Sequence, residues 1–241
     1  QLKHIFLQTA KRIRVSAEPL TQALEFASNT HHDSHQFLHL LFLELQNKYS
    51  INLKTLFKWN LKYSRFVNSN LDPLPPVNFQ EMDTILTLEK YGKNLFQSFN
   101  NSFSHEIFEA SKDIPHQTLI LPEFSTNTPN IAIFHFRFRE EQDKDFTPKF
   151  NDKPVHLPFL FNLTTWKTSN PTHKFHAAIL YFGNVHNGHY KCIIYSTKSD
   201  TFFLLDDLPA HSCIAIDIKK NVYKKLLAEK TTLIFYQKIS K

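Results

Sequence analysis

Glycine is scarce in this sequence, with three residues among 241, whereas an average chain carries about 7% glycine. Two of the three, Gly183 and Gly188, flank one short turn, and the stretch NGHYKCIIYSTKSDTFFLLDD runs from there to Asp207. A glycine at position 188 lets the backbone adopt a positive φ or lets a substrate chain pass close to it, where a side chain would obstruct. The stretch around Gly188 is therefore the first candidate for a functional site.

Cysteine is equally rare. The only two are Cys192 and Cys213, and no CxxC pair occurs, which excludes a disulfide framework and a thiolate zinc site. The sequence has no apolar run of about eighteen residues, the length that a membrane span needs, and no signal-peptide pattern at its start. These absences predict an intracellular protein, in the cytoplasm or the nucleus, with no membrane partner.

Positive charge is only modestly in excess. The formal net charge is +6, and the basic residues are scattered apart from a cluster at 11–14 and pairs at 219–220 and 224–225. Such a distribution is typical of a solvated surface and forms no continuous basic stripe. Nucleic acid is therefore not expected as a partner.

Hydrophobic periodicity divides the chain into a helical part and a β part. Residues 1–50 carry apolar residues at helical spacing, whereas residues 117–241 alternate and are rich in β-branched and aromatic side chains. Helices followed by an antiparallel-looking sheet predict one α+β domain over residues 1–241. Residues 51–116 carry weaker patterns and are assigned to neither part. The expected elements after residue 50 are a loop at 68–76, helices at 80–96 and 218–229, and strands at 117–121, 130–138, 155–163, 175–183, 190–196, 201–207 and 231–238.

The helical part is expected to contain three helices, over residues 2–13, 18–27 and 34–49. Asp33 is a suitable N-cap for the third, and Gln36 follows three residues later as a capping-box partner. The start of this helix is therefore well specified by the sequence.

Two strands separated by TKSD predict a β-hairpin in the candidate stretch. In that register His189 lies opposite Leu208, and its diagonal neighbour on the same face is Asp206. A carboxylate that accepts a hydrogen bond from an imidazole is the base-and-orienter half of a catalytic triad. His189 and Asp206 are therefore the candidate catalytic residues, with Asp207 the alternative if the strand carries a bulge.

The same register leaves this pair without a nucleophile. Cys192 is three residues from His189, so its side chain points to the opposite face of the strand, where a core cysteine is expected. Cys213 follows Pro209 on a connection that nothing places near His189. The chain supplies half of a triad, and a hydrogen-bonded surface pair without a catalytic role is the alternative.

Fourteen histidines raise the further alternative of a metal enzyme. No glutamate forms an HExxH arrangement with them, and His39 lies among leucines. No metal site is therefore predicted. The closely spaced histidines are His31, His35 and His39, with the pairs His173 and His176, and His186 and His189.

Four segments resemble motifs of the ubiquitin-specific protease family, in that family's order. GNVHNGHYKCIIY followed by FFLLDD resembles its histidine box, in which a Gly-His-Tyr and an Asp-Asp lie on successive strands. HHDSHQFLHLLFLEL resembles its QQDAxEFL helix, NIAIFHFRF its LIIHLKRF strand, and TTLIFYQK its closing AYxLFY strand. The resemblance extends from Asp33 to Lys238 and so covers most of the chain.

The resemblance implies the fold of a papain-like cysteine isopeptidase, described as a hand with a helical thumb, a β palm and fingers that grip ubiquitin. The helical thumb would lie in residues 1–50 and the β palm in residues 117–241. The implied partner is ubiquitin or a ubiquitin-like modifier, with a larger protein assembly as a further partner.

The resemblance also implies residue roles. His189 matches the general base and Asp206 the residue that orients it. Gly188 and Tyr190 match residues of the channel for the C-terminal tail of ubiquitin, and Asp33 matches an aspartate that contacts this tail. The implied reaction is thiolate attack on an isopeptide carbonyl.

The chain departs from the family pattern in one decisive place. The family's cysteine box, which supplies the nucleophile and oxyanion donors, precedes the helix motif, but none of the 32 residues before Asp33 is a cysteine. The chain begins at Gln1 and its sole methionine is Met82, which favours a nucleophile outside the chain. Gln36, where the family has glutamate, favours a catalytically inactive relative. The paired CxxC of the fingers is also missing, so neither a finger zinc nor another cofactor is expected.

The expected function is therefore thiol-dependent hydrolysis of ubiquitin isopeptide bonds, with the nucleophilic cysteine outside this chain. The alternative is an inactive relative that binds ubiquitin or acts as a scaffold in a larger complex.

Overall fold

The computed structural model describes residues 33–50, 53–59, 61–67, 72–77, 84–90, 93–103, 105–110, 115–124, 128–137, 140–142, 148–150, 153–165, 167, 169–183, 188–206 and 213–239. The chain forms two compact units, Gln1–Asn52 and Leu53–Lys241. The helices predicted at 2–13 and 18–27 lie outside the described residues.

The first unit contains helix α3 (Ser34–Tyr49), which confirms the third predicted helix. Asp33 caps it with an extended backbone, and its carboxylate accepts a hydrogen bond from the backbone N–H of His35 at 3.0 Å. This bond satisfies one of the amide groups that the first turn leaves without a helical partner. The helix ends at Ser50, which adopts a left-handed conformation and donates its N–H to the carbonyl of Leu45.

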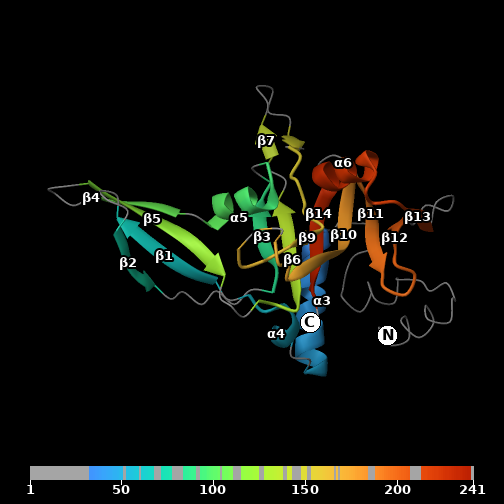
Figure 1. Cartoon of the computed structure of the whole chain (residues 1–241), viewed down its shortest axis with the longest axis horizontal. Coiled ribbons are helices and arrows are strands. Elements are labelled where there is room, and N and C mark those ends of the chain that lie inside the picture. The colour runs from blue at the N-terminus through green and yellow to red at the C-terminus, as the bar shows by residue number, and fades with distance from the viewer. Residues whose placement is uncertain are drawn as a thin grey trace. The chain divides into compact units, whose positions relative to one another are not determined.

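The second unit is built on an eight-stranded sheet in the order β13-β12-β11-β10-β14-β6-β3, with β9 paired to β10 (Figure 1). Each strand from β13 to β6 is antiparallel to its neighbour. The strands are β3 (Leu86–Glu89), β6 (Ile131–Arg137), β9 (Leu160–Phe161), β10 (His173–Gly183), β11 (Gly188–Ser196), β12 (Thr201–Leu205), β13 (Cys213–Ile216) and β14 (Thr231–Lys238).

Strand β6 corrects two details of the prediction. It pairs with β3 in parallel, with Leu86 beside Phe134, so the sheet is not antiparallel throughout. Its alternating pattern predicted one buried face, but all residues from 132 to 136 are buried. A strand inside a sheet that is covered on both faces buries both sets of side chains.

A separate four-stranded antiparallel sheet has the order β2-β1-β5-β4. The strand predicted at 117–121 lies in this sheet, within β5, and not in the large one. The loop predicted at 68–76 is wrong for its second half, which forms β2. The strands are β1 (Leu61–Val67), β2 (Asp72–Val77), β4 (His105–Ala110) and β5 (Pro115–Phe124), and a two-stranded sheet pairs β7 (Glu140–Gln142) with β8 (Pro148–Phe150).

Two more predicted elements are corrected. Within the segment 80–96, where a helix was expected, the structure has strand β3, and helix α5 (Leu95–Phe103) begins only near the end of that segment. A short helix, α4 (Lys54–Phe57), lies earlier in the chain. The strand expected at 155–163 is reduced to β9. Pro158 lies in its middle, and proline cannot donate a ladder hydrogen bond.

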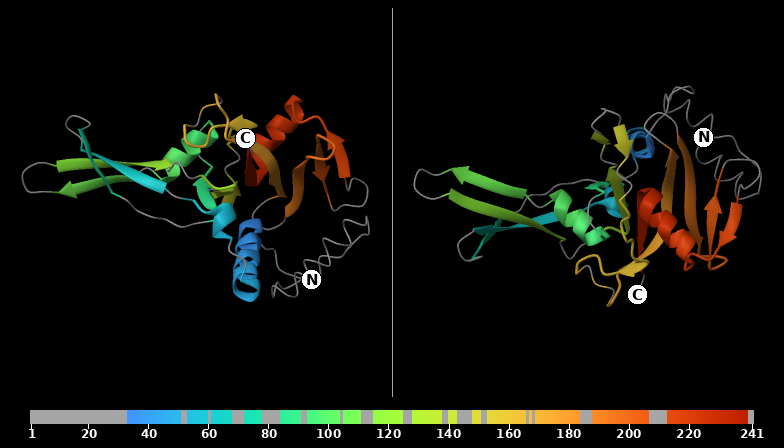
Figure 2. Two further views of the ribbon diagram at one scale, coloured as in Figure 1. Left: turned by 60° about the horizontal axis from the view of Figure 1, so that its bottom comes forward. Right: turned by 90° about the horizontal axis from the view of Figure 1, so that it is seen from above.

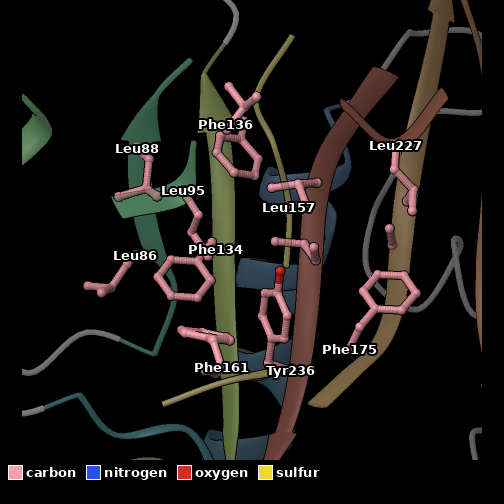
Figure 3. Packing of buried hydrophobic residues seen from close by; sticks show 14 of the residues in the cluster. Leu86, Leu88, Leu95, Phe134, Phe136, Leu157, Phe161, Phe175, Leu227 and Tyr236 are labelled. Atoms are coloured by element: carbon pink, nitrogen blue, oxygen red, sulfur yellow. The ribbon is translucent and has the colours of Figure 1, made fainter. Parts of the chain in front are cut away.

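The core lies along β6, β14 and β10 and is rich in aromatic rings (Figure 3). The ring centroids of Phe161 and Tyr236 are 4.8 Å apart, and those of Trp59 and Phe134 are 5.1 Å apart. Tilted and edge-to-face ring pairs of this kind add to the stabilisation from burial alone. This packed centre gives the neighbouring strands β11 and β12 a rigid support.

Helix α6 (Asn221–Lys230) confirms the short helix predicted before the last strand and packs against β10 and β14 (Figure 2). It buries Leu227 and leaves Val222 exposed. Among the described residues, no helix has the length and apolar character that crossing a membrane requires.

Candidate active site

The hairpin of β11 and β12 has the predicted register. Cys192 lies opposite Leu205 and Ser196 opposite Thr201, and the turn between the strands spans the TKSD segment. Asp200 ends this turn with a φ of 49°, and its carboxylate accepts a hydrogen bond from the hydroxyl of Tyr195. Aspartate tolerates the left-handed region well because its short side chain bonds locally. The turn therefore fixes which residues share a face further along the hairpin.

His189 and Asp206 meet at the open end of this hairpin. His189 Nε2 lies 2.7 Å from Asp206 Oδ1, and the Asp206 side chain is only 4% exposed while that of His189 is 30% exposed. An ionised carboxylate only accepts hydrogen bonds, so Nε2 carries the proton and the neutral ring has its lone pair on Nδ1. The geometry is that of an oriented general base.

A third residue, Lys191, also contacts Asp206. It is not among the site residues predicted from the sequence. Its Nζ lies 2.7 Å from Asp206 Oδ2, so the two carboxylate oxygens have different donors. The signal was available, because the register that selected Asp206 also places Lys191 directly opposite it.

Neither cysteine shares the face of His189. Cys192 alternates with Lys191 along β11 and is half-buried, and burial raises its pKa to about 11, so its thiol is protonated at neutral pH and is a poor nucleophile. Cys213 is exposed on β13 and pairs with Leu205, whose side chain points away from the face of Asp206. The prediction that Cys192 faces away from His189 agrees with this arrangement.

Gly188 and Tyr190 lie on the other face of β11 from the His189 side chain, since strand residues alternate. The ring of Tyr190 packs against that of Tyr181 on β10, with centroids 5.0 Å apart. A Cβ added at Gly188 would overlap the ring of Tyr181, and the φ of Gly188 lies outside the left-handed region. Of the two alternatives for Gly188, the structure does not have the positive φ, and the group that approaches this glycine closely is the Tyr181 ring.

Replacing Gly188 by alanine is expected to lower the free energy of unfolding by about 1 kcal/mol, because the new methyl group must displace the Tyr181 ring. The cost should largely disappear in a Tyr181→Leu background, where the ring is gone. Urea denaturation of the two single variants and the double variant measures this coupling. Equal costs of Gly188→Ala in both backgrounds would show that Tyr181 is not what excludes a side chain.

The remaining candidates do not belong to the hairpin of β11 and β12. Asp33 belongs to the first unit, where its carboxylate caps α3. His35 and His39 stack on the same helix with centroids 6.4 Å apart. His173 is buried and has Nε2 at 2.9 Å from the carbonyl of Pro129, and burial lowers its pKa, as expected of a structural histidine. His31, His186 and Asp207 lie outside the described residues.

The model of the ubiquitin carboxyl-terminal hydrolase family matches residues 1–236 of the chain. The chain belongs to this family. The match agrees with the resemblance that the four motifs carry. No relative of this chain is found by sequence among curated proteins.

Solved structures of one family member have the same fold. The SAGA DUB module of Ubp8, Sgf11, Sus1 and Sgf73 bound to monoubiquitin matches with a TM-score of 0.68 at 15% identity, over 93% of this chain and 52% of that chain. The same module bound to ubiquitin aldehyde gives the same values, and the yeast module with an Sgf73 mutant gives a TM-score of 0.59 at 14% identity, over 86% and 51%. The chain thus shares the fold of these solved structures and spans about half the length of the solved chains.

Proposed function

We propose that this chain is a ubiquitin-specific-protease-like domain for thiol-dependent hydrolysis of ubiquitin isopeptide bonds, with the nucleophilic cysteine supplied from outside these 241 residues. The observation that carries the proposal is the 2.7 Å contact between His189 Nε2 and the buried carboxylate of Asp206. A buried carboxylate that contacts the imidazole of a partly exposed histidine is the arrangement of a general base and the group that orients it.

In the proposed reaction, His189 Nδ1 accepts the thiol proton, and the thiolate attacks the isopeptide carbonyl. The imidazolium then donates this proton to the leaving lysine amine, and water hydrolyses the thioester with His189 again acting as base. Asp206 stabilises the imidazolium and holds the ring by its Nε2–H.

Ubiquitin is the proposed substrate, and a larger assembly is the proposed context, since the similar solved structures hold ubiquitin and partner subunits. For the C-terminal tail of ubiquitin we propose contacts with Asp33, Gly188 and Tyr190. In the hand, residues 1–50 form part of the thumb, the eight-stranded sheet forms the palm, and the four-stranded sheet corresponds to the fingers. The proposed location is the cytoplasm or the nucleus.

A second function is favoured by a specific observation. Neither Cys192 nor Cys213 lies on the face of His189, so a chain acting alone would bind ubiquitin without cleaving it. Binding depends on buried area and tail contacts rather than on the thiol. The alternative is therefore a ubiquitin-binding or scaffold module that has lost its chemistry.

Hydrolysis of ubiquitin that carries a fluorogenic C-terminal amide, by the full-length protein, separates the two functions. The deubiquitinase releases the fluorophore and loses this activity after thiol alkylation. The scaffold module binds ubiquitin and releases nothing.

A further inference from the structure

Lys191 shares the carboxylate that orients His189. Its Nζ lies 2.7 Å from Asp206 Oδ2, whereas His189 Nε2 lies 2.7 Å from Asp206 Oδ1. We infer that Lys191 is a positioning residue, which fixes the rotation of the Asp206 carboxylate and thereby the orientation of the His189 ring. The inference rests on the proposed function, because it gives Lys191 a part in the same reaction.

The hairpin itself places the three side chains together. Cys192 and Leu205 are opposite each other in the ladder, so Lys191 and Asp206 are opposite at the next position, and His189 is two residues further along β11 on the same face. One donor is thus directly across from the carboxylate and the other is diagonal to it. A carboxylate held from two directions cannot turn about its last side-chain bond without losing both contacts.

Charge explains why a lysine suits this position. The Asp206 side chain is 4% exposed, and a buried carboxylate needs a compensating charge as well as hydrogen bonds. Neutral His189 donates one hydrogen bond but no charge, whereas Lys191 supplies a full positive charge. Lys191 therefore keeps the carboxylate ionised without requiring that His189 be protonated, and an unprotonated imidazole is what a general base must be.

A second contact holds the ammonium in place. Lys191 Nζ lies 5.0 Å from the ring centroid of Phe182 on β10, a distance at which a cation is attracted to an aromatic face. Phe182 is the cross-strand neighbour of His189, so strand β10 supports both residues. The Lys191 side chain is only 26% exposed, so it is more restricted than a typical lysine on a protein surface.

The test compares Lys191→Met, which keeps the length of the side chain and removes its charge, with Lys191→Arg, which keeps the charge. In the full-length protein, Lys191→Met is expected to lower kcat for the fluorogenic ubiquitin amide by about tenfold with KM nearly unchanged. The NMR signal of the His189 Nε2–H proton, measured on the same protein, should exchange with water faster, because the carboxylate that accepts from it is no longer held in place. Lys191→Arg should restore both readouts.

Lys174→Met is the matched control. Lys174 Nζ also lies over an aromatic ring, that of Tyr195 at 5.3 Å, in the same sheet, but Lys174 belongs to β10 and is not part of the hairpin pair. It should leave kcat and the water exchange of the His189 Nε2–H proton unchanged.

Wild-type kcat and unchanged water exchange of the His189 Nε2–H proton in Lys191→Met, with only a lower Tm, would overturn the inference and leave a structural ion pair. If Lys191→Met does not fold, Lys191→Gln replaces it in the same comparison. If the wild-type protein does not hydrolyse the ubiquitin amide, the proposed function fails. In that case the NMR comparison, which needs no turnover, still decides whether Lys191 positions the imidazole.

Discussion

Replacing His189 by alanine in the full-length protein is expected to lower kcat for ubiquitin hydrolysis by about 10³-fold, because both proton transfers of the reaction pass through this imidazole. KM and the affinity for ubiquitin should change little, since His189 acts on the reacting bond and the extended contact surface remains. Steady-state kinetics with the fluorogenic ubiquitin amide, together with a binding titration, measure the two effects separately.

His156→Ala is the control for this variant. His156 is exposed and precedes β9, and its backbone N–H donates to the carbonyl of Lys93, a bond that the substitution keeps. It should retain the wild-type kcat. If the His189→Ala protein kept more than about a tenth of the wild-type kcat, the result would show that His189 does not carry out the proton transfers.

Replacing Asp206 by asparagine is expected to lower kcat by about 10³-fold to 10⁴-fold, the effect known when a triad histidine is held in the wrong tautomer. An asparagine at position 206 has only one acceptor oxygen. Lys191 and His189 then compete for it, and we expect the charged ammonium of Lys191, which lies 2.7 Å from Asp206 Oδ2 in the native protein, to bind it. The amide N–H₂ then faces His189 Nε2, which must accept, so the ring proton moves to Nδ1.

The competition between Lys191 and His189 for the asparagine oxygen predicts that substitutions at positions 191 and 206 are coupled. Loss of the carboxylate charge alone predicts no such coupling. In the double variant Lys191→Met, Asp206→Asn, the amide oxygen can turn towards His189, so kcat should exceed that of Asp206→Asn alone. Asp207→Asn is the control and should have a small effect, because it leaves the 2.7 Å contact between His189 Nε2 and Asp206 Oδ1 in place. A double variant no faster than Asp206→Asn would contradict the competition, and an equal loss in Asp207→Asn would contradict the role of Asp206.

The hairpin could be predicted because it depends on local signals. Alternation and a four-residue turn determine the register, and the register alone brings His189 and Asp206 to one face. The same register also places Lys191 directly opposite Asp206, so the position of Lys191 could be predicted from the sequence as well.

The predictions for β2 and β3 were wrong because the conformation of these segments depends on the strands and core residues that they pack against. Strand β2 contains Pro73, Pro75 and Pro76, which predict a loop. Yet β2 is an edge strand of its sheet, and its pairing with β1 has a register shift between Tyr63 and Arg65; edge strands and bulges are the places in a sheet that accept proline. Strand β3 lies inside a segment of helical appearance, but its buried residues Leu86 and Leu88 pack in the core beside β6. Tertiary burial of this kind overrides local propensity. The Tyr181 ring that covers Gly188 belongs to another strand, so the sequence could not identify it.

The central claim is that His189 and Asp206 serve a cysteine that lies outside these residues. Treating the full-length protein with ubiquitin that carries a C-terminal electrophile, and mapping the adduct by mass spectrometry, tests it most directly. The claim predicts a single adduct on a cysteine outside the 241 residues, lost when His189 is replaced by alanine. An adduct on Cys192 or Cys213 would contradict the assignment of faces in the hairpin, and no adduct with ubiquitin binding retained would show a module that binds without chemistry.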